Sequence, residues 1–198
     1  MGTNSGEKPR RGRPRDPDAE PRIRRYAVQL LLERGFDGMT VDDVAEAAGV
    51  GKATIYRRWA SKEQLANDAL ADLFDIEIPD ADTGSIAGDL RQVYRDALAF
   101  VNSADGVALV RLAVTELNRG EPFAVFYRAF LERRVDQTEA ALKRARARGE
   151  RVREDADPVL MVQWLAGVLI LRAMTREPMP RVEDTDHLVQ MTLRCILE

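Results

Sequence analysis

The sequence has 198 residues, of which 45% are apolar, a formal net charge of −3 and one cysteine. This length suits one medium core or a small domain joined to a larger one, and the lone Cys195 excludes an internal disulfide, as expected of a protein in a reducing cytoplasm. No apolar run begins the chain, so no secretory signal is expected, and the apolar stretch 159–171 is too short to cross a bilayer.

Charge is distributed unevenly along the chain. Residues 1–62 carry 13 lysines and arginines against 9 acids, whereas residues 63–198 carry 17 against 24. A basic N-terminal segment on an acidic body suggests an anionic partner for that segment. A solvated basic tail explains the charge equally well, so charge alone does not decide between the two interpretations.

Residues 1–17 are predicted to be a disordered basic tail, because they hold three prolines, three glycines and almost no large apolar side chain. Within them, the segment 11–15 reads Arg-Gly-Arg-Pro-Arg and resembles an AT-hook. Arg11 and Arg13 suit the narrow, negative minor groove of A·T-rich DNA. The alternative is a nonspecific arm that contacts phosphates.

A first helix is predicted over residues 19–34, followed by a shorter helix and a turn that leads into a third. Thr40 is a good N-cap, the next residues place an apolar stripe on one face, and Gly49 suits the left-handed end of this second helix. Another helix begins near Lys52, with Ile55 turned inward and a polar, aromatic and basic outer face. Two helices joined by a short glycine-containing turn predict a helix-turn-helix, whose second helix reads DNA.

The run from Ile23 to Leu65 resembles the DNA-binding domain of the TetR family of bacterial regulators. The resemblance rests on about a dozen fixed positions, which are Ile23, Gly35-Phe36, Thr40-Val41, Val44-Ala45, Ala48-Gly49-Val50, Thr54-Ile55-Tyr56, Trp59, Ser61-Lys62-Glu63 and Leu65.

The resemblance implies roles for the residues of this motif. It places Lys52, Ala53 and Thr54 near base edges, and Thr40, Tyr56, Arg58 and Lys62 on phosphates, with Arg57 able to do either. One position departs from the family pattern: Asp42 stands where some members carry a base-reading cation, so a base contact from the first helix of the motif is not expected.

The predicted fold class is all-α, with a three-helix reading domain and a helical body. A connecting helix over 62–75 completes a domain of residues 18–75, and residues 76–84 are interpreted as a linker that opens the body, residues 76–198. Helical periodicity in the body predicts helices over residues 85–102, 105–119, 121–148, 158–176 and 183–197.

The helix over 158–176 is apolar nearly all round between Val159 and Leu171, so it needs cover on both sides. A second subunit is the natural cover, and the family resemblance likewise implies a homodimer formed by the last two helices. Aromatic and methionine side chains elsewhere in the body predict an apolar cavity for a hydrophobic small molecule, although each residue is also a plausible core residue. The proposed lining is Tyr94, Leu112, Phe123, Phe126, Tyr127, Phe130, Met161 and Trp164, with Arg111 or Glu116 as a polar contact.

Catalytic and metal chemistry find no support in the sequence. His187 and Cys195 are the sole residues of their types, and no Ser/His/Asp set, metal-ligand spacing or phosphate loop is recognisable. We therefore expect no enzyme activity, metal or cofactor, and no membrane partner. The leading hypothesis is a cytoplasmic, ligand-responsive repressor that binds a palindromic DNA operator as a homodimer. The alternatives are a ligand-blind or architectural binder of A·T-rich DNA and a helical protein-interaction module.

Overall fold

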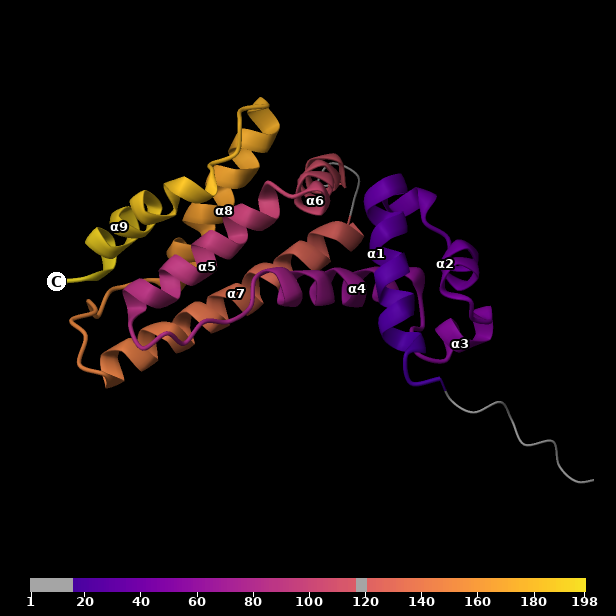
Figure 1. The fold of residues 1–198 in the computed structure, drawn as a ribbon, viewed down its shortest axis with the longest axis horizontal. Coiled ribbons are helices and arrows are strands. Elements are labelled where there is room, and N and C mark those ends of the chain that lie inside the picture. The colour runs from indigo at the N-terminus through magenta and orange to yellow at the C-terminus, as the bar shows by residue number, and fades with distance from the viewer. Residues whose placement is uncertain (1–15, 117–120) are drawn as a thin grey trace, which may run out of the picture.

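The computed structural model describes residues 16–116 and 121–198, apart from the side chains of residues 76, 116 and 121–126. Every regular element within these ranges is helical, which confirms the predicted all-α class (Figure 1). The helices are α1 (Ala19–Gly38), α2 (Val41–Ala48), α3 (Lys52–Tyr56), α4 (Lys62–Glu77), α5 (Ile86–Val101), α6 (Ala104–Glu116), α7 (Glu121–Ala147), α8 (Pro158–Thr175), the 3-10 turn η1 (Val182–Asp184) and α9 (Thr185–Ile196).

Helices α1 to α3 gather at one end of the molecule, and the C-terminus lies at the other end (Figure 1). The apolar stripe of α1 is buried at Ile23, Ala27, Leu30 and Leu31. Gly35 interrupts this helix at φ 74°, a left-handed value that glycine adopts without steric cost, and one further turn follows it. The predicted tail residues Arg11 and Arg13 lie outside the described residues.

Helix α4 connects this end of the molecule to the body, and it continues two residues beyond the predicted end at 75. The segment that follows it is not a free linker, because Ile78 and Ala81 are buried. Side chains of α7 hold it: Arg134 donates to the carbonyl oxygen of Ile78 and Arg144 to that of Ala81, both at 2.6 Å. Residues 78–85 thus connect α4 to α5 as a segment packed against α7, and the domain boundary placed at residues 76–84 stays a prediction.

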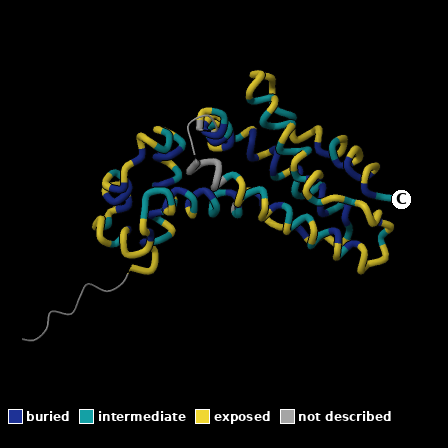
Figure 2. The backbone as a smooth tube through the Cα atoms, turned by 180° about the vertical axis from the view of Figure 1, so that it is seen from behind, coloured by how far each residue is buried: buried dark blue, intermediate teal, exposed yellow. Residues whose placement is uncertain are grey.

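The body is a layer of packed helices, in which α5 lies against α9 and α7 against α8. Helix α6 turns away from α5 and packs against α1. Helix α1 belongs to the end of the molecule formed by α1 to α3, which is called the reading end below. As a result, one hydrophobic core runs from α1 and α4 into α5 and α6 (Figure 2). The reading end and the body share packed side chains, so that a change of packing in one can be felt by the other.

Helix α8 keeps an apolar face in contact with solvent within one protomer. Leu160, Leu171 and Met174 are 62–64% exposed, and Gly167 lies on the same helical face with open space beside it. By length and composition this helix is apolar enough to cross a membrane, a property that it shares with helices buried inside soluble assemblies.

Candidate nucleic-acid interface and effector cavity

The ends of the helices in the helix-turn-helix are set by the local contacts that were predicted from the sequence. The Thr40 hydroxyl caps α2 by accepting from the backbone N–H of Asp43 at 3.1 Å, and Gly49 ends this helix at φ 65°. Ile55 is 1% exposed and anchors α3 to the core. The opposite face of α3 and the turn after it therefore reach the surface: Lys52, Ala53, Tyr56, Arg57 and Arg58 are exposed, and Thr54 is half-buried.

Lys52 begins α3 and is paired with an acid of the preceding helix. Its Nζ lies 2.9 Å from the carboxylate of Asp42, and this hydrogen bond raises the pKa of Lys52 above its ordinary value. The same ammonium stands 5.9 Å from the centre of the Tyr56 ring. Lys52, which is expected to contact base edges, is thus already paired with Asp42. Asp42 is the residue that departs from the family pattern.

Two acids of the reading end also hold arginines. Arg58 pairs with Glu20 of α1 at 2.9 Å, and Glu20 simultaneously accepts from Arg24 at 2.7 Å. Arg34 pairs with Asp43 at 3.3 Å. Arg24 is part-buried and also pairs with Asp72 of α4 at 3.0 Å. Arg58 and Arg34 are exposed, and a phosphate is an alternative partner for each of these two arginines.

Lys62 has an internal role that sequence reasoning missed. Its Nζ donates to the carbonyl oxygen of Phe36 at 2.9 Å and stands 4.2 Å from the centre of the Phe36 ring. The lysine therefore joins the start of α4 to the last turn of α1, just after the break at Gly35. Contact with a phosphate remains a prediction, and it has to share the ammonium with this anchor.

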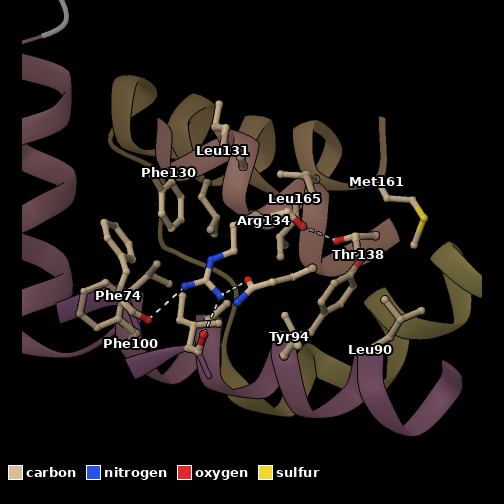
Figure 3. A pocket seen from close by; sticks show the side chains of 18 of the residues that line it. Phe74, Leu90, Tyr94, Phe100, Phe130, Leu131, Arg134, Thr138, Met161 and Leu165 are labelled. Carbon is tan, nitrogen blue, oxygen red and sulfur yellow. Dashed lines mark hydrogen bonds between the residues drawn. The ribbon is translucent and has the colours of Figure 1, made fainter. Parts of the chain in front are cut away.

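A cavity of about 170 Å³ lies in the body, bounded by the end of α4 and by helices α5 to α8 (Figure 3). Four of the residues proposed from sequence line it, namely Tyr94, Tyr127, Phe130 and Met161. Burial raises the pKa of both tyrosines, so they remain neutral. The Tyr94 hydroxyl is hydrogen-bonded to the hydroxyl of Thr192 at 3.0 Å, which links the cavity wall to α9.

Other residues of the proposed lining lie elsewhere. Leu112 is buried in the core shared with α1, and Trp164 packs beside a second cluster, one position off the α8 stripe that faces the cavity. Both residues lie on helical faces that point away from the cavity. Helical periodicity shows which residues share a face, but it does not show which neighbour that face contacts. Arg111 is exposed on α6 and is absent from the lining. The side chains of Phe123, Phe126 and Glu116 lie outside the described residues.

The main polar group of the cavity, Arg134, was not predicted. Arg134 is 9% exposed, and its guanidinium donates to the carbonyl oxygens of Ile78 at 2.6 Å and Phe74 at 3.1 Å, and to the side chain of Gln137 at 2.9 Å (Figure 3). Phe130 stands against it, 5.3 Å from guanidinium carbon to ring centre. Burial lowers the pKa of Arg134 from its ordinary value.

Comparison with known proteins places this architecture in a family. Residues 23–69 match the model of bacterial regulatory proteins of the tetR family, and residues 80–192 match that of the tetracyclin repressor-like C-terminal domain. The chain belongs to the TetR family. TetR-family regulators bind DNA and typically act as dimers with small-molecule effectors, and the earlier identification of the motif is confirmed.

Individual relatives of this TetR-family protein include two curated regulators. The chain is 33% identical over 166 residues to the uncharacterized HTH-type transcriptional regulator YdeS of Bacillus subtilis, and the match covers 83% of each protein. It is 32% identical over 148 residues to the HTH-type transcriptional regulator AqdR of Rhodococcus erythropolis, covering 75% of this chain and 70% of AqdR. A solved structure, the flavonoid-responsive regulator FrrA, is similar with a TM-score of 0.63 and 26% identity, covering 92% of this chain and 98% of FrrA.

The described residues of this TetR-family protein contain no candidate metal site. No cluster of three or more histidine, cysteine or acidic side chains is placed to hold an ion among those residues. His187 and Cys195 are both exposed on α9. The outer face of α3 and the cavity beside Arg134 are the two candidate sites.

Proposed function

We propose that this protein is a homodimeric, ligand-responsive transcriptional repressor of the cytoplasm. In this proposal it binds a near-palindromic operator and leaves it when a hydrophobic small molecule fills the body. The observation that carries the proposal is the apolar cavity at the end of α4, the helix that continues directly from the reading end. An effector that fills this space would contact the connecting helix at Phe74 and would alter the packing that α4 shares with the reading end.

Roles on DNA follow the resemblance and the exposed positions. Lys52, Ala53 and Thr54 are proposed to meet base edges in the major groove, where side chains of a recognition helix distinguish base pairs. Phosphate contacts are proposed for Thr40, Tyr56, Arg58 and Lys62, and Arg57 is proposed for either role. The exposure of α3 supports this assignment, since its outer face is available to a groove.

The homodimer is proposed to form through α8 and α9. The exposed face of α8 carries Leu160, Leu171 and Met174 around Gly167, a small residue that lets a second helix approach closely. Met191 of α9 adds a fourth large apolar side chain at 41% exposure. Covering these side chains with a second subunit removes apolar surface from water, which favours association.

Effector binding is proposed to act through shared packing rather than through contact with DNA. The cavity is lined by Phe74 of α4 and by Leu109 and Ala113 of α6, and α6 packs on α1. A ligand favours the arrangement of these helices that fits it best, and it can weaken DNA binding only by its differential affinity for that arrangement. FrrA is named as flavonoid-responsive, which supports a response to small molecules in a protein of this shape.

A ligand-blind binder of A·T-rich DNA is the second candidate, favoured by the basic tail around Arg11 and Arg13. Selection of bound sequences from a random duplex pool, with the full chain, separates the two. A repressor is expected to enrich a near-palindrome whose half-sites lie about 34 Å apart. Enrichment of A·T-rich duplexes without a shared palindrome would overturn the proposed repressor and support the alternative.

A further inference from the structure

The cavity contains a buried cation, Arg134, that has no ion-pair partner among the described residues. Arg134 is a cation with 9% of its surface exposed in a mainly apolar lining. A buried charge is costly unless a counter-charge and full hydrogen bonding compensate it. Among the described residues, no carboxylate forms an ion pair with Arg134, whereas its neighbour Arg133 is paired with Asp75 at 2.8 Å on the surface.

The hydrogen bonds of Arg134 leave a specific part of the guanidinium available. Its three described bonds run from Nη1 to Ile78 and Gln137, and from Nη2 to Phe74. Nε is buried and has no hydrogen-bond partner. Nη2 carries a second N–H beyond the one used, so two neighbouring nitrogens retain donors, and a carboxylate accepts from such a pair in a bidentate arrangement.

The other charged groups of the lining do not compete for this role. Asp89 is 2% exposed, and its Oδ1 accepts from Thr83. Its Oδ2 has no hydrogen-bond partner, but Arg144 and Arg148 stand 3.9 and 3.7 Å from it and compensate its charge. Asp80 is engaged with Arg144 at 3.8 Å. The carboxylates of Asp75 and Asp80 act on Arg134 only through space, and neither forms an ion pair with it. Arg134 is therefore the charged group of the lining that has no ion-pair partner among the described residues, and the partner that it lacks is an anion.

The remaining lining sets the other half of the ligand. Side chains such as Leu90, Val93, Leu165 and Leu169 offer apolar contact and no polar atom. The cavity of about 170 Å³ is similar to engineered cavities of about 150 Å³ that bind benzene. The space thus suits one ring or a short alkyl chain beside the head group.

We propose that the effector is a small apolar carboxylic acid whose carboxylate pairs with Arg134. This proposal rests on the proposed function, and it names the chemical class of the effector and the residue that reports its presence. Figure 3 shows Arg134 reaching across the pocket to the carbonyl oxygen of Phe74, so the same guanidinium touches the cavity and the last turn of α4. A carboxylate bound at Nε and at the second N–H of Nη2 shares Nη2 with the carbonyl oxygen of Phe74. Because the carboxylate is the stronger acceptor, its binding shifts the guanidinium relative to the end of the connecting helix.

The test compares matched ligands on the full-length dimer by calorimetry. The probes are 4-methylbenzoate, cyclohexanecarboxylate and hexanoate, each with its primary amide and its primary amine analogue. At least one acid is expected to bind about 10- to 100-fold more tightly than its amide, the range expected for charge-assisted hydrogen bonds. Equal or weaker binding of every acid overturns the proposal, and tighter binding of the amines would assign the site to Asp89 instead.

Two neighbouring arginines provide the variant and its control. In Arg134→Met the acid-to-amide affinity ratio should fall to about one, whereas Arg133→Met, which removes the surface arginine beside it, should retain the wild-type ratio. Because each ratio compares two ligands on one protein, a loss of stability in the variant does not imitate the result. A ratio that survives in Arg134→Met overturns the pairing, and the wild-type comparison decides the proposal if that variant does not fold.

Operator release distinguishes this inference from the function on which it rests. If amides release the selected operator as well as acids do, the repressor function stands and the carboxylate proposal fails. If acids bind with the expected preference but leave DNA affinity unchanged, the ligand class stands and ligand-responsive repression fails. The acid is expected to lower operator affinity in the wild type and in Arg133→Met, and to lose this advantage over its amide in Arg134→Met.

Discussion

Lys52, the first residue of α3, is paired with Asp42 of α2 through an Nζ to carboxylate distance of 2.9 Å. The acid raises the pKa of Lys52, so the ammonium stays charged, but it also offsets that charge at the surface proposed to meet DNA. A free lysine contacts any phosphate, whereas this lysine has to exchange one acceptor for another. The pair therefore reduces nonspecific attraction and leaves the contact to sites that offer a well-placed acceptor.

Replacing the acid of this pair should strengthen DNA binding irrespective of sequence. In Asp42→Asn we expect affinity for random duplex to rise about threefold to tenfold, with the salt dependence steeper by about one charge, because Lys52 is released to phosphates. Titration of duplex at several salt concentrations measures both quantities. Glu46→Gln removes an exposed acid from the same helix without touching Lys52, and an equal gain in that control would show that only net charge matters.

Loss of the Lys62 ammonium should destabilise the reading end even without DNA. In Lys62→Met the Phe36 carbonyl oxygen loses its charged donor and the ring loses its cation, so we expect the free energy of unfolding to fall by about 1 kcal/mol. Urea unfolding of the free protein provides the measurement. Unchanged stability together with weaker DNA binding would return Lys62 to a phosphate contact alone.

The helix-turn-helix could be predicted because its determinants are local. Thr40 caps three residues ahead, Gly49 supplies a left-handed end, and Ile55 follows the helical period, so each is visible in a short window of sequence. The partners of its charges are less visible. Lys62 and the Phe36 carbonyl oxygen are 26 residues apart, and the packing of α4 against α1 brings them together next to the break at Gly35.

The cavity was predictable in composition but not in its polar detail. Tyr94, Tyr127, Phe130 and Met161 were identified by residue type and predicted helix, whereas Trp164 has the right type on the wrong helical face. Arg134 looked like one of many charged residues in α7. Its role depends on the end of α4, about 60 residues earlier in the chain, and no periodicity connects the two.

A charge on the exposed face of α8 should separate the proposed dimer. In Leu171→Glu, a side chain that is 62% exposed in one protomer would bury a carboxylate between two protomers, so we expect monomers at micromolar concentration and loss of operator binding. Light scattering after size exclusion reports the mass. Val107→Glu places the same charge on exposed α6, where Val107 is 45% exposed, and should stay dimeric. A dimeric Leu171→Glu protein would move the interface elsewhere.

Filling the cavity from α6 should remove the ligand response and spare DNA binding. Ala113 is 4% exposed and lines the cavity, so the ring of Ala113→Phe enters space that the effector needs. Overpacking costs about 1–3 kcal/mol in a filled core, and less here because the ring has a cavity to occupy. We expect the selected operator to bind within about threefold of wild type, while the tightest acid of the panel no longer raises the melting temperature or releases DNA. Ala99→Phe, on the exposed side of α5, controls for the added ring and should respond as wild type does. A variant that still releases its operator with the acid would place the effector site outside this cavity.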